Sequence, residues 1–196
     1  MCRTLSRPPQ AIILAGPNGA GKTTTAGDLL PAGIKFVNAD MIAQEISGVP
    51  GTAGDINAGR VLLEQLERLV TAREDFGVET TLSALTLAKR IQSWKDRGYE
   101  IDLIYIWLPS PDLAVERVAA RVRFGGHQVP EDTIRRRYVN GLRNLFRSYI
   151  DLADSWRVRE NSSETGPVDI VTYNKAAGLS VHDAAKWELI QSTWQT

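Results

Sequence analysis

The sequence predicts an α/β fold, in which a mostly parallel sheet of five or six strands has helices on both faces. Two observations lead to this prediction. Short apolar runs rich in β-branched residues, which are typical of buried parallel strands, alternate with longer amphipathic segments of helical periodicity. The first apolar run also ends in a glycine-rich turn followed by a helical segment. Such alternation implies a parallel sheet that binds its ligands at the carboxyl ends of the strands.

The expected strands and helices follow one another along the whole chain. Strands are predicted at residues 11–15, 36–40, 76–80, 101–108, 155–159 and 169–173. Helices are predicted at residues 21–30, 58–74, 85–97, 111–124, 131–149 and 181–191. Pro130 favours the start of the fifth helix because proline is well suited to a first helical turn. Its apolar residues recur every three or four positions, so one face is expected to pack against the sheet.

Length and composition indicate one domain. The 196 residues are expected to form a single unit with a small lid around residues 121–131, where Gly125 and Gly126 separate two helices. Hydrophobic residues make up 43% of the chain, and the counts of basic and acidic residues are equal at 23 each, as in an ordinary globular protein. This balance gives no general attraction to nucleic acid, so nucleic acid is not an expected partner.

The compartment is predicted from cysteine and hydropathy. The single cysteine, Cys2, has no internal partner, and the ten residues before the first strand are too few for a signal peptide. No apolar run approaches the ~20 residues that a membrane-spanning helix needs. We therefore expect a cytoplasmic protein without a membrane segment.

A phosphate-binding motif lies between the first strand and the first helix. It matches the pattern G-x-x-x-x-G-K-[ST] at every fixed position, and its residues are Gly16, Pro17, Asn18, Gly19, Ala20, Gly21, Lys22 and Thr23. In such a loop the backbone N–H groups surround the phosphates and the helix N-terminus faces them. Lys22 should reach the β- and γ-phosphates, Thr23 should ligate Mg²⁺, and Thr24 should contact the α-phosphate. ATP and Mg²⁺ are therefore the predicted cofactors, and the fold is predicted to be a three-layer P-loop NTPase.

Other features narrow the class of P-loop protein. The chain lacks the apolar run ending in Asp-Glu that motor and transporter ATPases carry, and it lacks a Leu-Ser-Gly-Gly-Gln signature. The nearest match to the guanine-reading motif Asn-Lys-x-Asp is Asn174-Lys175-Ala176-Ala177, which has no aspartate. These absences favour a small kinase that uses ATP.

Two acidic residues follow strands beside the phosphate site. Asp40 is the candidate base that takes the proton of an acceptor hydroxyl; its alternative role is to cap the short helix expected at Met41. Glu79 could hold acceptor hydroxyls or a magnesium-bound water. Its alternative role is to cap the next turn together with Thr80 and Thr81.

The segment from Arg117 to Arg147 contains eight arginines and two acids, so it should meet an anionic group. Arg121 and Arg123 precede the paired glycines, where a moving lid could place them over the transferred phosphoryl group; the helix dipole alone would also favour cations there. His127 could contact phosphate or be an ordinary surface residue. Residues 135–137, all arginine, are interpreted as a solvated helix face.

Taken together, the motifs resemble the zeta-toxin family of P-loop kinases, especially its small stand-alone members. The resemblance covers most of the chain. It depends on the nine residues from Gly16, on Asn38-Ala39-Asp40, on Glu79-Thr80-Thr81-Leu82, on residues 121–127, and on Asn161-Ser162.

The resemblance implies an adenylate-kinase-like fold and phosphorylation of a sugar hydroxyl of uridine-diphosphate-N-acetylglucosamine. It implies Asp40 as base, Lys22 on the phosphates and Arg121 on the transferred group. It places Glu79 with the acceptor, and Asn161 and Ser162 near the adenine. Thr80, Arg123 and His127 are further candidates for binding the substrate. This chain is shorter than the larger toxins and carries His127 where those toxins have a second lid arginine.

Three other functions stay open at the level of sequence. The acceptor could be another small metabolite or an antibiotic alcohol, because related kinases use the same parts. It could be a nucleic-acid 5′-hydroxyl, although the basic segment lacks interleaved aromatic residues for stacking on bases. The chain could also be a non-catalytic ATP-binding regulator. An antitoxin partner is expected only if the chain is a toxin.

Overall fold

The computed structural model describes residues 7–42, 54–126, 128–163 and 166–195. Its strands are β1 (Gln10–Ala15), β2 (Lys35–Val37), β3 (Phe76–Thr80), β4 (Glu100–Trp107), β5 (Ser155–Glu160), β6 (Val168–Asn174) and β7 (Gly178–Val181). Its helices are α1 (Lys22–Leu29), α3 (Gly54–Ala72), α4 (Thr86–Asp96), α5 (Pro111–Arg123), α6 (Glu131–Asn144), the π-helix η1 (Leu145–Tyr149), α7 (Ile150–Leu152) and α8 (Ala184–Gln195).

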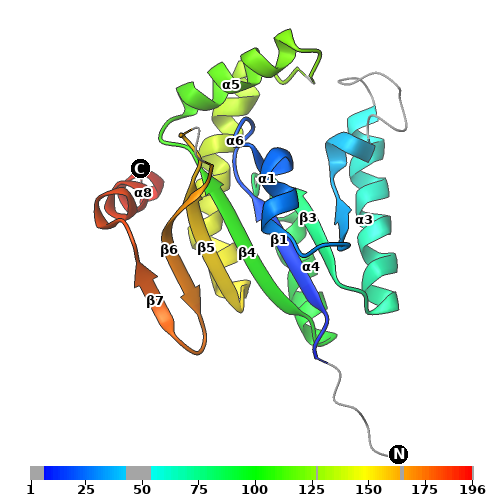
Figure 1. The fold of residues 1–196 in the computed structure, drawn as a ribbon. Helices are drawn as coiled ribbons and strands as arrows, with labels where there is room; N and C mark the ends of the chain where they lie inside the picture. The colour runs from blue at the N-terminus through cyan, green and yellow to red at the C-terminus, as the bar shows by residue number, and fades with distance from the viewer. Residues whose placement is uncertain (1–6, 43–53, 127, 164–165, 196) are drawn as a thin grey trace, which may run out of the picture.

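The strands form one twisted sheet in the order β2-β3-β1-β4-β5-β6-β7 (Figure 1). The first five strands in this order run parallel, and β6 and β7 add two antiparallel pairings at one edge. The predicted α/β class and the mostly parallel sheet are confirmed. The expected five or six strands were too few, since the described residues form seven.

Helices cover both faces because the buried strands alternate their side chains between two hydrophobic clusters. In β1, Ala11 and Ile13 belong to the cluster that packs under α3, α4 and α8, whereas Ile12 and Leu14 belong to the cluster under α1 and α5. The three-layer arrangement that the sequence predicts is therefore present. No helix of the described residues is long and apolar enough to cross a bilayer.

Helix α6 passes between the two layers at the carboxyl edge of the sheet. Near its start, Ile134 and Tyr138 pack in the cluster under α1 and α5, whereas Leu142 and the following Leu145 pack in the opposite cluster. The Tyr138 hydroxyl donates a 2.7 Å hydrogen bond to the Leu108 carbonyl just beyond β4. This path brings the middle of α6 to the edge where the phosphate motif lies.

Three segments differ locally from the sequence prediction. The strand expected at 36–40 ends at Val37, and residues 39–42 begin a helix. The closing helix begins at Ala184, because residues 178–181 pair with β6 instead. The last turns of the helix expected to run to Tyr149 form the π-helix η1.

Candidate active site

The phosphate loop has a backbone with positive φ, which favours glycine, at Gly16, Gly19 and Gly21. Gly16 has φ +141°, and a Cβ there would lie 2.3 Å from the Ile106 carbonyl oxygen of the neighbouring strand β4. Gly21 has φ +81°, and a Cβ there would lie 2.6 Å from Asn161 Nδ2. Both the backbone conformation and the close packing exclude a side chain. The loop is thus held in a compact turn directly before α1.

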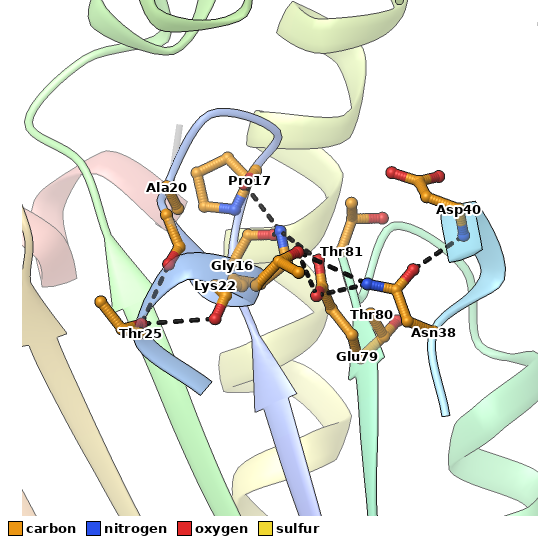
Figure 2. A network of polar contacts seen from close by, with 12 residues as sticks. Gly16, Pro17, Ala20, Lys22, Thr25, Asn38, Asp40, Glu79, Thr80 and Thr81 are labelled. Atoms are coloured by element: carbon orange, nitrogen blue, oxygen red, sulfur yellow. Dashed lines mark hydrogen bonds and ion pairs between the residues drawn. The ribbon is translucent and has the colours of Figure 1, made fainter. Parts of the chain in front are cut away.

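Lys22 is buried inside this loop, with 6% of its surface exposed. Its Nζ donates 2.9 Å hydrogen bonds to the carbonyl oxygens of Gly16 and Pro17, and it lies 3.6 Å from Glu79 Oε1 (Figure 2). Burial lowers the pKa of Lys22, while the negative charges of Glu79 and Asp40 act in the opposite direction. A phosphate would supply the anionic partner that favours the charged lysine in this position.

Thr23 and Glu79 come together beside Lys22. The Thr23 hydroxyl donates a 2.8 Å hydrogen bond to Glu79 Oε2. Asn38 Nδ2 donates a 2.7 Å bond to the same oxygen, as Figure 2 shows. Glu79 lies at the end of β3, where β3 pairs with β1, so two adjacent strands deliver the carboxylate and the phosphate loop to one place. A hydroxyl beside a carboxylate is the oxygen donor set that Mg²⁺ uses in nucleotide sites, so these residues fit that ion. The described residues contain no group of three or more His, Cys, Asp or Glu side chains that could hold a metal by themselves.

The alternative role of Glu79 as a cap for the next turn finds no support in its contacts. The Leu82 amide instead donates a 3.1 Å hydrogen bond to the Thr80 hydroxyl. Thr80 therefore helps to shape the turn after β3, while Glu79 faces the phosphate loop.

Asp40 has a carboxylate that does not cap the helix it belongs to. The side-chain oxygen of Asn38 accepts hydrogen bonds from the backbone amides of Asp40 at 2.7 Å and Met41 at 3.4 Å. Asn38 is therefore the N-cap, and the capping role considered for Asp40 is wrong. The Asp40 side chain is exposed and lines a cleft that also contains Lys22 and Glu79.

This cleft has a volume of about 380 Å³ and lies between the phosphate loop, β3 and the helices α3, α4 and α6. The residues that line it are Asn18, Lys22, Asn38, Ala39, Asp40, Gly59, Leu62, Leu63, Val78, Glu79, Thr80, Thr81, Ser83, Ala84, Thr86, Leu87 and Arg137. Five predicted site residues thus share one cavity: Asn18, Lys22, Asp40, Glu79 and Thr80. Its size suits a ligand of the dimensions that enzyme pockets commonly hold.

The sequence interpretation missed Arg137. Residues 135–137 were all expected to lie on a solvated face, and this is correct for Arg135, whose guanidinium pairs with Asp112 at 2.7 Å and Glu131 at 2.8 Å on the surface. Arg136 is also exposed. Arg137 is half-buried and lines the cleft, so the expectation was wrong for this residue. The sequence did contain a signal, because Gly141 one helical turn later marks a close approach of α6 to another segment.

Asn161 holds the phosphate loop from the far side. The side-chain Nδ2 of Asn161 donates a 2.9 Å hydrogen bond to the Ala20 carbonyl oxygen. The backbone carbonyl oxygen of Asn161 accepts a 2.5 Å hydrogen bond from Arg117 Nη1. Arg117 also donates to the Ser162 carbonyl oxygen at 3.1 Å. The structure therefore gives Asn161 a direct contact with the loop, and it adds Arg117 as a supporting residue that the motifs did not reveal.

The segment proposed as a lid begins at the end of α5. Arg121 and Arg123 are exposed in its last turns, and Gly125 has φ +82° just beyond them. The charge of Arg121 is close enough to act on Lys22, whose pKa it lowers further. His127 lies outside the described residues, so its predicted role stays a prediction, as does the movement of the lid.

Gly141 fixes the wall of the cleft, which leads to a prediction. A Cβ at this position would lie 2.4 Å from the Thr81 carbonyl oxygen. We expect Gly141→Ala to lower the free energy of unfolding by about 1–3 kcal/mol, because α6 and the loop after β3 must separate. Urea unfolding followed by circular dichroism measures this change.

The matched control is Gly27→Ala in the exposed middle of α1, where a Cβ meets nothing within 4 Å. This change should raise the free energy of unfolding by about 0.5–1 kcal/mol, since alanine favours a helix more than glycine does. Equal effects of the two substitutions would contradict the close packing of α6 on Thr81.

Comparisons with known proteins agree with this geometry. Residues 12–138 match the model of the AAA_33 family, which is described as an AAA domain. A protein of Haemophilus influenzae is 31% identical over 129 residues, which is 66% of this chain and 92% of that protein.

Two solved structures share the fold. AvrRxo1-ORF1, in its complex with AvrRxo1-ORF2 and ATP, superposes with a TM-score of 0.74 at 21% identity over 96% of this chain. Only 65% of that longer chain is covered. The structure reported for the PezAT toxin–antitoxin system of Streptococcus pneumoniae superposes with a TM-score of 0.61 at 17% identity, covering 97% of this chain and 86% of the other.

The resemblance to zeta-toxin kinases expected from the motifs is thus confirmed at the level of the fold. Because the family model covers well over half of the sequence, including the phosphate loop, Asp40 and Glu79, the chain belongs to the AAA_33 family of P-loop, kinase-like domains.

Proposed function

We propose that this protein is an ATP-dependent kinase that transfers the γ-phosphoryl group of ATP to a hydroxyl of a small molecule. The observation that carries the proposal is the position of Asp40. Asn38, and not Asp40, caps the helix, and the Asp40 side chain lines the same cleft as Lys22 and Glu79. A carboxylate without a structural role next to a phosphate loop is suited to take the proton of an attacking hydroxyl.

The other residues fit roles on the nucleotide. The loop amides and Lys22 would hold the β- and γ-phosphates, Thr24 would lie by the α-phosphate, and Asn161 and Ser162 would lie near the adenine. Thr23 and Glu79 would hold Mg²⁺, directly or through a water. The ion neutralises negative charge on the phosphates during transfer.

The remaining roles concern the transferred group and the acceptor. Arg121, whose charge already acts on Lys22, would stabilise the charge that develops on the phosphoryl group. Thr80 and Glu79 would contact the acceptor, with Arg123 and His127 contributing from the lid. By resemblance to the zeta toxins, the first candidate acceptor is a sugar nucleotide like uridine-diphosphate-N-acetylglucosamine.

The cellular setting belongs to the same proposal. We infer a cytoplasmic location, because ATP and Mg²⁺ are abundant there and the chain has a single cysteine. The PezAT protein comes from a toxin–antitoxin system, which makes an antitoxin a reasonable partner to test.

The test is acceptor-dependent turnover. The protein is incubated with ATP and Mg²⁺ and with each member of a panel: uridine-diphosphate-N-acetylglucosamine, simple sugars, small-molecule alcohols and a 5′-hydroxyl oligonucleotide. We expect one class of acceptor to raise ADP formation and to gain one phosphate by mass spectrometry. ADP formation that no acceptor changes would contradict a kinase and favour an ATPase or a nucleotide switch.

A further inference from the structure

Arg137 is placed in the wall of the cleft by a close contact between α6 and the loop that follows β3. One helical turn after Arg137, Gly141 lies so close to Thr81 that no side chain fits between them. One turn further, Asn144 Nδ2 donates a 2.7 Å hydrogen bond to the Leu82 carbonyl oxygen. Residues four positions apart lie on the same helix face, so the face that carries Arg137 is the face bound to this loop.

A third contact continues the attachment beyond α6. The Tyr149 hydroxyl donates a 2.7 Å hydrogen bond to the Ala84 carbonyl oxygen. Burial raises the pKa of Tyr149 to about 12, so the hydroxyl keeps its proton and stays a donor at physiological pH. The segment 81–84 is therefore fixed at three points, and the position of the Arg137 backbone relative to it is fixed as well.

The charge of Arg137 has no partner among the described residues that would explain its position. Within the described residues no hydrogen bond or ion pair involves its guanidinium, whereas Arg135 in the same helix is paired with two carboxylates. Among the residues that the structure describes, two cationic side chains line the cleft, and the other, Lys22, is held in the phosphate loop. A half-buried guanidinium without a carboxylate gains most from an anionic group that it can bind through two hydrogen bonds.

The rest of the lining suits the other parts of such a molecule. The hydroxyls of Thr81 and Ser83, which lie 2.9 Å apart, belong to the segment 81–84 on which α6 packs, and both residues line the cleft. Leu62, Leu63 and Leu87 provide an apolar wall. An acceptor could thus place its polar groups against the hydroxyls and its anionic group against the Arg137 guanidinium.

We propose that Arg137 binds an anionic group, a phosphate or a carboxylate, of the acceptor whose hydroxyl is phosphorylated, and so selects anionic over neutral acceptors. The inference rests on the proposed kinase function. It assigns Arg137 to substrate specificity rather than to phosphoryl transfer, because ATP binds at the phosphate loop and the base is Asp40. Arg137 accordingly affects the KM of the acceptor and not kcat.

The first experiment compares matched acceptors that differ by an anionic group: uridine-diphosphate-N-acetylglucosamine with N-acetylglucosamine, and gluconate with glucose. With the anionic members, Arg137→Ala should raise KM about 10- to 100-fold and leave kcat nearly unchanged, since hydrogen bonds between charged groups are strong. Arg137→Lys should recover part of the loss. The control Arg136→Ala, on the exposed face of the same helix, should behave like the wild type.

The second experiment measures binding without turnover. The protein is saturated with a non-hydrolysable ATP analogue and Mg²⁺, and is then titrated in a calorimeter with uridine diphosphate, uridine, gluconate and glucose. We expect at least one anionic probe to bind more tightly than its neutral counterpart, with the difference lost in Arg137→Ala. The pair that shows the difference separates a phosphate from a carboxylate.

The outcomes separate this inference from the proposed function. Equal binding of anionic and neutral probes, no binding of any probe, or the same preference in Arg137→Ala would overturn the role of Arg137. If acceptors are phosphorylated with a KM that ignores Arg137, the kinase stands and this inference fails. If anionic probes need Arg137 but no acceptor is phosphorylated, the anion site stands and the kinase fails.

Discussion

Replacing Lys22 with methionine is expected to reduce ATP turnover by at least about 10³-fold. The Lys22 ammonium group is the cation buried inside the phosphate loop, and methionine keeps the apolar stem while removing the charge. Removing a charged group that stabilises a transferring phosphoryl group costs several kcal/mol of transition-state stabilisation. The measurement is ADP formation with saturating Mg²⁺ and the best acceptor found.

The Lys22→Met variant should still fold, which makes its loss of activity interpretable. Burial lowers the pKa of Lys22, so the charged form costs free energy in the folded protein at any pH below that lowered value. Methionine removes this cost but also two hydrogen bonds to the loop, and we expect the free energy of unfolding to change by less than about 2 kcal/mol. Lys89→Met, at an exposed position of α4, is the control. Full turnover in Lys22→Met would exclude the loop as the phosphate site.

Replacing Asp40 with asparagine is expected to lower kcat by about 10²- to 10⁴-fold, the range that a general base contributes. Asparagine has nearly the same shape but cannot take a proton from the acceptor hydroxyl. ATP affinity should change little, because Lys22 and Thr23 hold the nucleotide. Turnover is measured as phosphorylated acceptor, and affinity is measured by calorimetry with the non-hydrolysable analogue.

Stability separates this prediction from the alternative in which Asp40 has only a structural role. Asn38 caps the helix at residues 39–42, so Asp40→Asn should melt within about 1 °C of the wild type. Asp28→Asn, on the exposed side of α1, is the matched control and should retain full activity. A variant with unaltered turnover would mean that Asp40 is not the base, and a non-catalytic ATP-binding regulator would then be the better description.

The sequence was sufficient to predict the elements whose side chains are buried on both faces. β1 and β4 consist mostly of buried apolar residues and β3 begins with three buried residues, and the structure has all three strands within one residue of the predicted bounds. β7 was missed because it has only four residues, three of which are exposed, so it buries no apolar face that a sequence pattern could reveal. That strand depends on antiparallel pairing with β6, which is a tertiary interaction that local sequence does not encode.

The site follows the same distinction. The loop was predicted from its residue types, which follow from the chemistry of binding phosphate, and the structure has it between β1 and α1 as expected. Its binding of phosphate stays a prediction. Whether Asn38 or Asp40 caps the next helix could not be decided, because both residue types are good caps and lie two positions apart. The position of Arg137 depends on how α6 crosses the edge of the sheet, which is a tertiary property. The run of three arginines alone therefore led to a wrong prediction of a solvated position for Arg137.

Asn18, in the phosphate loop, offers the cleft a hydrogen-bond acceptor that a ligand can use. Its side chain is 8% exposed and lines the cleft, and its Oδ1 is buried without a hydrogen-bond partner among the described residues. The folding free energy already includes the loss of water from this oxygen. A ligand that donates a hydrogen bond from a hydroxyl or an amide N–H to Asn18 Oδ1 does not have to remove water from this oxygen again. The loop is therefore preorganised to favour such ligands over ligands of the same shape that lack the donor.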